Sequence, residues 1–210
     1  MAETVNITER TARTERLERV VALRAGYGFR SAIEEFSDGN IVAVQLRDIQ
    51  RDKVNWASAV RTRLERAPAK DEWLRTGDIL FPFRGSRFSA IALGDVPSPA
   101  VASSQFMLLR LLEPAALLPE FLAWQLNQPI LQRYFELVAE GTAQRSLRRS
   151  AIEAATIIIP SIERQRSTMQ LVTLVRRERE ALEEIIKTRE QQLLQVATLL
   201  LRVEAPEDAV

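Results

Sequence analysis

The segment RSTMQLVTLVRREREALEEIIKTREQQLLQVATLLLRV, from Arg166 to Val203, decides the organisation of this chain. It contains no glycine and no proline, and its apolar side chains recur at the spacing of one helix face. At about 1.5 Å per residue, a helix of this length would extend roughly 57 Å. We therefore predict one long C-terminal helix, which the remaining residues are too few to cover along its whole length.

The apolar residues of this helix follow a heptad pattern in which some core positions are polar. A strip this wide requires a covering partner, so we predict a dimer interface, with packing inside the chain's own domain as the alternative. The predicted interface residues at the a and d positions are Leu171, Val175, Glu178, Leu182, Ile185, Arg189, Gln192, Val196 and Leu199.

The charged core positions favour an antiparallel homodimer. In a parallel pair, Glu178 and Arg189 would each face their own copy, which buries like charges. In the antiparallel register that places Glu178 opposite Arg189, apolar layers also match and the helices cross between Glu183 and Glu184. The alternative is pairing with a helix of another protein.

Length and composition favour one globular domain with an appended helix. The chain has 210 residues, of which 46% are hydrophobic and 27% charged, as in ordinary globular proteins. We divide it into a polar N-terminal tail (1–16), a domain (17–160), the long helix (161–203) and a tail (204–210). No apolar run is long enough for a membrane span, and no signal peptide is evident, so we expect a cytoplasmic protein.

The domain is predicted to be rich in β-structure, which gives an α+β fold class overall. Apolar runs predict strands near 17–23, 41–46, 79–81, 89–93, 100–112 and 155–159. Pro119 and Pro129 predict the first turns of two helices. Pro82 favours an edge strand or a bulge over a central position, and the polar, basic segment 47–70 is expected on the surface.

The composition excludes much familiar catalytic chemistry. The chain has no cysteine and no histidine, so it lacks thiolate ligands, disulfides and the commonest general base. It also has no phosphate-binding loop, no GxSxG motif and no glycine-rich loop of a methyltransferase. We expect no catalytic residues and no metal ligands in this chain.

Polar side chains suited to DNA recognition lie where apolar elements end. Arginine and glutamine form bidentate hydrogen bonds with base edges, and serine commonly contacts phosphates. Ordinary solvated charges are the alternative, since the net charge is only +1. The candidate DNA-binding residues are Arg30, Ser31, Arg84, Ser86, Arg87, Gln144 and Arg145.

The order of several short motifs resembles the specificity (S) subunits of type I restriction-modification systems. The motifs, which span about residues 16–203, are Leu17–Val20, Gly26–Phe29, Gly77–Phe81 with Arg84-Gly85, Leu118–Leu122, Gly141–Gln144, and Ile157–Pro160 with Glu163 and Gln165 before the long helix. In that family, a recognition domain followed by a long helix usually occurs twice, and the two helices form an antiparallel coiled coil. Here the unit occurs once, so the resemblance is to a half-size S subunit.

The resemblance implies a non-catalytic protein that reads one half of a split DNA site. Its partners would be double-stranded DNA, a methyltransferase subunit that carries S-adenosylmethionine, and possibly a restriction subunit. The alternative is a coiled-coil scaffold or DNA-binding dimer without a methyltransferase partner. A nuclease that relies on carboxylates is a more distant alternative.

Overall fold

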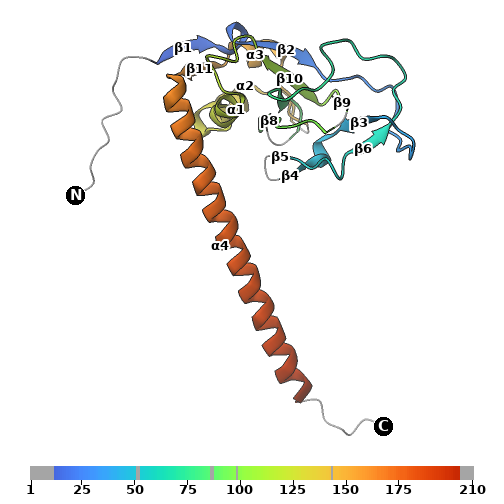
Figure 1. The fold of residues 1–210 in the computed structure, drawn as a ribbon, viewed down its shortest axis with the longest axis vertical. Helices are drawn as coiled ribbons and strands as arrows, with labels where there is room; N and C mark the ends of the chain where they lie inside the picture. The colour runs from blue at the N-terminus through green and yellow to red at the C-terminus, as the bar shows by residue number, and fades with distance from the viewer. Residues whose placement is uncertain (1–11, 51–52, 86–87, 98, 143, 204–210) are drawn as a thin grey trace, which may run out of the picture. The chain divides into compact units, whose positions relative to one another are not determined.

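The structure is a computed structural model, which describes residues 12–50, 53–85, 88–97, 99–142 and 144–203. The chain divides into two compact units, residues 1–166 and 167–210. Figure 1 shows their elements, and each unit is described by itself. Within the described residues, every helix is too short or too polar to cross a lipid bilayer.

The first unit is built around a four-stranded antiparallel sheet of order β2-β10-β7-β8. Its two middle strands come from the longest apolar runs of the domain, so nearly all their side chains are buried. The strands are β2 (Val21–Ala25), β7 (Ile79–Pro82), β8 (Ile91–Ala92) and β10 (Phe106–Leu111).

The expected edge position of Pro82 is wrong, because β7 lies between β10 and β8. Phe83 donates its N–H to Gln105 O (3.3 Å), so the backbone N of Pro82 faces away from β10. On that other side, β8 pairs only with Ile79 and Leu80. The missing N–H of Pro82 therefore removes no hydrogen bond from the sheet.

A second sheet of order β6-β3-β9 packs its side chains into the same core. Its strands are β3 (Ile41–Val44), β6 (Val60–Thr62) and β9 (Ala100–Ala102). Strands β3 and β9 are parallel, and Val42 and Val44 share one buried cluster with Leu80 and Leu108 of the first sheet. The core thus lies between the two sheets.

The expectation that segment 47–70 lies wholly on the surface is also wrong. It contains β6 and the antiparallel pair of β4 (Ile49–Gln50) and β5 (Lys53–Val54). Val60 and Thr62 are buried because alternate residues of β6 face the core, and Asp48 is buried where its carboxylate accepts the N–H of Gln45 (2.8 Å).

Residues 13–16, expected to belong to the N-terminal tail, form strand β1 (Arg13–Arg16). This strand pairs antiparallel with β11 (Thr156–Ile159), and the next residue, Leu17, is fully buried. The segment RTER has no apolar alternation, so only its distant pairing partner makes it a strand.

Helices complete the first unit. The prolines at 119 and 129 stand in the first turns of α1 (Pro119–Leu126) and α2 (Pro129–Val138), as predicted. A six-residue helix, α3 (Arg149–Ala154), lies where no element was predicted from the sequence. The short 3-10 helices are η1 (Leu17–Arg19) and η2 (Leu46–Asp48).

The predicted long helix is confirmed as α4 (Ile162–Val203). Its first turn belongs to the first unit, where the side chain of Gln165 is fully buried. The Gln165 amide accepts the N–H of Leu118 (2.8 Å) and donates to Ala116 O and Pro160 O (both 2.9 Å). Gln165 therefore links the start of α4 to the segment that precedes α1 and to the residue that follows β11.

Candidate nucleic-acid interface

Two loops that carry predicted DNA-binding residues pair with each other as a short antiparallel ribbon. The Gly85 N–H donates to Arg145 O (3.0 Å), and the Leu147 N–H donates to Phe83 O (2.8 Å). We call residues 83–85 and 145–147, together with Glu140, the arginine ribbon. The ribbon brings the loop after β7 against the loop after α2.

Ser146 lies in the middle of the arginine ribbon. It is paired with Arg84 on one side and with Glu140 on the other. Ser146 and Glu140 exchange both backbone hydrogen bonds, at 2.9 Å each. All these backbone groups are satisfied locally, so the ribbon has a defined geometry although it lies outside the sheets.

Glycine permits the tight turn that closes this ribbon. Gly141 has φ of +93°, a conformation that side chains with a Cβ rarely adopt, and an added Cβ would lie 2.6 Å from Gln144 O. Helix α2 ends before this turn, at Val138. Gln144 is exposed in this turn.

The ribbon places two of the predicted arginines in different surroundings. The Arg84 guanidinium lies 5.2 Å from the centre of the Phe83 ring, and no carboxylate among the described residues pairs with it. Arg145 donates from Nη2 to Glu136 O at the end of α2. The other predicted residues of this region, Ser86 and Arg87, lie outside the described residues.

The remaining predicted pair, Arg30 and Ser31, is on another loop. Both β2 and β7 are antiparallel to β10, so the loop after β2 leaves the sheet at the same end as the loop after β7. The Arg30 side chain is 89% exposed and lies 3.6 Å from a Glu65 carboxylate oxygen. The Ser31 hydroxyl donates only to Ala32 O, at 3.4 Å.

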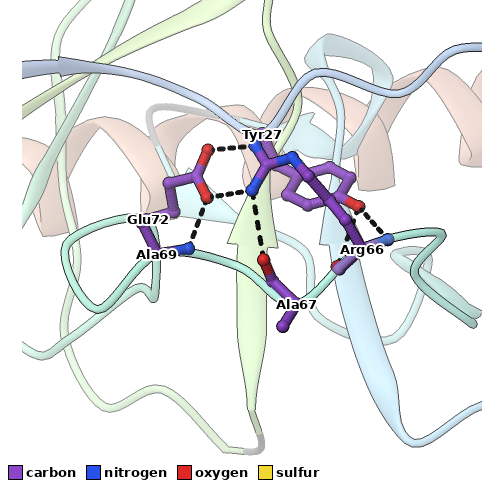
Figure 2. A network of polar contacts seen from close by, with 5 residues as sticks. All are labelled: Tyr27, Arg66, Ala67, Ala69 and Glu72. Carbon is purple, nitrogen blue, oxygen red and sulfur yellow. Dashed lines mark hydrogen bonds and ion pairs between the residues drawn. The ribbon is translucent and has the colours of Figure 1, made fainter.

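A network centred on Tyr27, shown in Figure 2, holds the segment next to Arg30 in place. The buried Tyr27 hydroxyl donates to Arg66 O (3.0 Å) and accepts the N–H of Arg66 (3.1 Å). The Arg66 guanidinium lies over the Tyr27 ring and forms two hydrogen bonds with the Glu72 carboxylate, at 2.5 and 2.7 Å. The same group donates to Ala67 O, and Glu72 accepts the N–H of Ala69.

These contacts shift the titration of both charged partners. The hydrogen bond with Arg66 holds the pKa of Glu72 below its ordinary value, and the hydrogen bond with Glu72 raises the pKa of Arg66. The N–H groups of the Arg66 guanidinium therefore donate mainly within the domain, and few of them are left for a ligand.

A second arginine that donates within the domain, Arg110, lies on β10, one of the two middle strands of the first sheet. Its guanidinium donates from Nε and Nη2 to the two oxygens of buried Asp78, both at 2.7 Å, and from Nη2 to Trp73 O (2.9 Å). Asp78 also accepts the N–H of Arg75 (2.8 Å), and the hydrogen bond with Asp78 raises the pKa of Arg110. Nothing in the sequence links Asp78 to residue 110, so this ion pair could not be predicted.

Solved structures share the fold of this chain over nearly its whole length. The S subunit of a type I restriction-modification system from M. genitalium is 16% identical, with a TM-score of 0.56 over 97% of this chain and 48% of that chain. A chain from a study of complex assembly and conformational transition of the type I R-M system is 17% identical, with a TM-score of 0.70 over 96% and 47%. The HsdS subunit from Thermoanaerobacter tengcongensis is 18% identical, with a TM-score of 0.64 over 100% and 54%.

This chain has the fold of a type I specificity subunit. It spans about half the length of each of the three solved chains. No model of a protein family matches the sequence, and no curated protein matches it significantly. The fold inferred from the order of short motifs is therefore confirmed by structural likeness at low sequence identity.

In this specificity-subunit fold, the long helix α4 exposes its apolar side chains. The exposed large aliphatic residues between Leu171 and Leu201 have between 53 and 70% of their surface accessible. Two of the polar core positions contact each other, since Arg189 donates to Gln192 Oε1 (3.0 Å). Arg179 and Glu183, which are not core positions, form an ion pair (3.0 Å). The predicted interface residues thus share one exposed stripe of a single helix.

Proposed function

We propose that this chain is a non-catalytic, DNA-reading specificity subunit of a type I restriction-modification complex in the cytoplasm. Superposition on three specificity-subunit structures over at least 96% of this chain carries the proposal. The first unit would bind one half of a split DNA site. A methyltransferase subunit, with S-adenosylmethionine bound to it, would modify the site, and a restriction subunit would complete the complex.

The arginine ribbon is the part of the first unit best suited to DNA. An arginine without a carboxylate partner keeps its donors and its charge for a guanine edge or a phosphate. Among the residues that the structure describes, Arg84 meets this condition, and Gln144 is exposed in the adjoining turn. Arg30, Ser31, Ser86 and Arg87 stay predictions as DNA contacts, whereas the Arg145 guanidinium is bound to Glu136 O.

We further propose that α4 pairs with a second copy of itself in the antiparallel orientation. The exposed stripe supports this, because about half of each large side chain on it is accessible and would be covered by a partner. The register that places Glu178 opposite Arg189 also sets Leu182 opposite Ile185. Moving the register by one heptad would leave both charges facing apolar residues.

The experiment combines partner capture with DNA binding. The tagged chain should retain a methyltransferase subunit when both are produced together, and the complex should bind its own site with an affinity that falls steeply as salt increases. Comparison of genomic methylation with and without this chain would identify the site. If the chain binds DNA but retains no methyltransferase subunit, the alternative of a scaffold or DNA-binding dimer is favoured instead. Absent or salt-insensitive binding by the complex would contradict DNA reading.

A further inference from the structure

The two faces of the arginine ribbon have different surroundings. Successive residues of an extended segment point to opposite faces. Leu147 is buried, with only 3% of its surface accessible, and Arg145 is bound to a carbonyl of α2. Residues 145 and 147 therefore point towards the domain, and Ser146 between them points towards the other, outer face.

The backbone pairing puts Arg84 on the same outer face as Ser146. The hydrogen bonds that flank this pair, from Gly85 to Arg145 and from Leu147 to Phe83, are those of a non-hydrogen-bonded antiparallel pair. Directly opposite residues of such a pair lie on one face, with Cα atoms about 4.5 Å apart. Ser146 and Arg84 therefore stand directly opposite each other on one face of the ribbon.

Glu140 completes a row of polar side chains across the ribbon. It lies directly opposite Ser146 on the other side, and its carboxylate accepts a hydrogen bond from Arg148 Nε at 2.9 Å. Arg84 and Glu140 are exposed, and Ser146 is half-buried between them. The ion pair with Arg148 offsets the negative charge of Glu140, which would otherwise repel a DNA strand.

We propose that Ser146 determines specificity together with Arg84, and that Arg145 is a positioning residue. This inference rests on the proposed function. The major groove admits a two-stranded ribbon, arginine recognises guanine O6 and N7, and a serine hydroxyl donates to or accepts from a neighbouring base edge. The pair Arg84 and Ser146 would read adjacent positions of the half-site.

The role assigned to Arg145 follows from where its guanidinium is bound. A cation at the carboxyl end of a helix is stabilised by the unpaired carbonyls there, and Glu136 O is one of the acceptors in this region. Arg145 therefore holds the inner face of the ribbon on α2, while its backbone carbonyl accepts the N–H of Gly85. It would set the angle at which Ser146 and Arg84 approach DNA.

The test uses an isosteric pair of variants in the complex with the methyltransferase. Ser146→Thr keeps the hydroxyl, and Ser146→Val has nearly the same shape without it. Dissociation constants are measured for the complex's own site and for each single base-pair change in that site. We expect Ser146→Thr to keep the wild-type discrimination within about twofold, and Ser146→Val to lose about fivefold at one base pair, as for one lost hydrogen bond.

Arg145→Ala provides the contrasting result. We expect it to weaken binding to all sites by a similar factor and to lower the thermal stability of the complex, with discrimination unchanged. Equal discrimination by Ser146→Val and Ser146→Thr, or relaxation at one base pair in Arg145→Ala, would overturn this inference while leaving DNA reading intact. A wild-type complex without any site preference would instead overturn the proposed function and this inference with it.

Discussion

The arginine ribbon and the Tyr27 network both carry arginine, but they leave the guanidinium groups in opposite states. Arg84 on the ribbon has a Phe83 ring beside it and no carboxylate partner among the described residues. Arg66 in the network is stacked on Tyr27 and bound by both oxygens of Glu72. The number of arginines in a segment therefore says little about DNA binding until their partners are known.

The largest effect is expected for Arg110, where the paired carboxylate is buried. Arg110→Met keeps much of the side-chain volume but leaves the buried Asp78 carboxylate without its cation, so we expect a loss of about 3–5 kcal/mol in the free energy of unfolding. Chemical denaturation measures this. Arg24→Met is the matched control, because the Arg24 and Asp71 side chains are 59% and 42% exposed, and it should cost below about 1 kcal/mol. Similar losses in both variants would contradict the distinction.

Removing the Tyr27 hydroxyl tests how firmly the network holds its loop. Tyr27→Phe leaves the N–H and C=O of Arg66 without their partner, so we expect a loss of about 1–3 kcal/mol. Tyr134→Phe removes a single hydrogen bond, to Ala151 O, and should cost less. An unfolding midpoint in Tyr27→Phe equal to that of the wild type would show that the network is dispensable.

Reversing the charges of α4 tests the proposed dimer. If Glu178 and Arg189 pair across it, Glu178→Arg and Arg189→Glu should each weaken it by about 1–2 kcal/mol, since each change sets like charges opposite one another. The double variant should recover the wild-type affinity. Analytical ultracentrifugation measures the dissociation constants, and single variants that dimerise like the wild type would exclude this register.

The smallest effect concerns pH. The pKa of Glu72 is lowered in the folded protein by its hydrogen bond with Arg66, so the pairing stabilises the fold fully above the ordinary value of about 4.3. This stabilisation is lost as pH falls through the lower folded-state pKa. The difference in unfolding free energy between the wild type and Glu72→Gln should therefore shrink as the pH falls below the ordinary carboxyl pKa. A difference that stays constant as the pH falls would mean that the carboxylate charge contributes nothing.

The elements that could be predicted from sequence are those with local signals. Helix α4 has heptad spacing without glycine or proline, and α1 and α2 begin at prolines. Strand β1 and helix α3 have no comparable signal, because β1 depends on pairing with β11 and α3 is only six residues long. The prediction for Pro82 was wrong for a related reason. A proline is tolerated in β7 because β8 ends before it reaches Pro82, and the sequence does not show where β8 ends.

The candidate site was predictable in residue type but not in arrangement. The sequence indicates that Arg84, Gln144 and Arg145 end apolar elements, but the pairing of Arg84 with Ser146 joins segments about sixty residues apart. The bond between Arg145 and the end of α2 is equally a property of the fold. Ser146 was missed because a lone serine between arginine and leucine carries no signal of the face to which it points.

Binding of the site by Arg84→Ala and Arg63→Ala complexes tests the central claim most directly. Arg63 is the matched arginine, since it pairs with Asp38 and lies 5.2 Å from the Phe36 ring. At one fixed salt concentration, we expect Arg84→Ala to lower the affinity of the methyltransferase complex for its own site about 5- to 150-fold, as for a lost base contact, and Arg63→Ala to change it less than about twofold. Equal losses in the two variants, or no loss in Arg84→Ala, would contradict DNA reading by Arg84 of the ribbon.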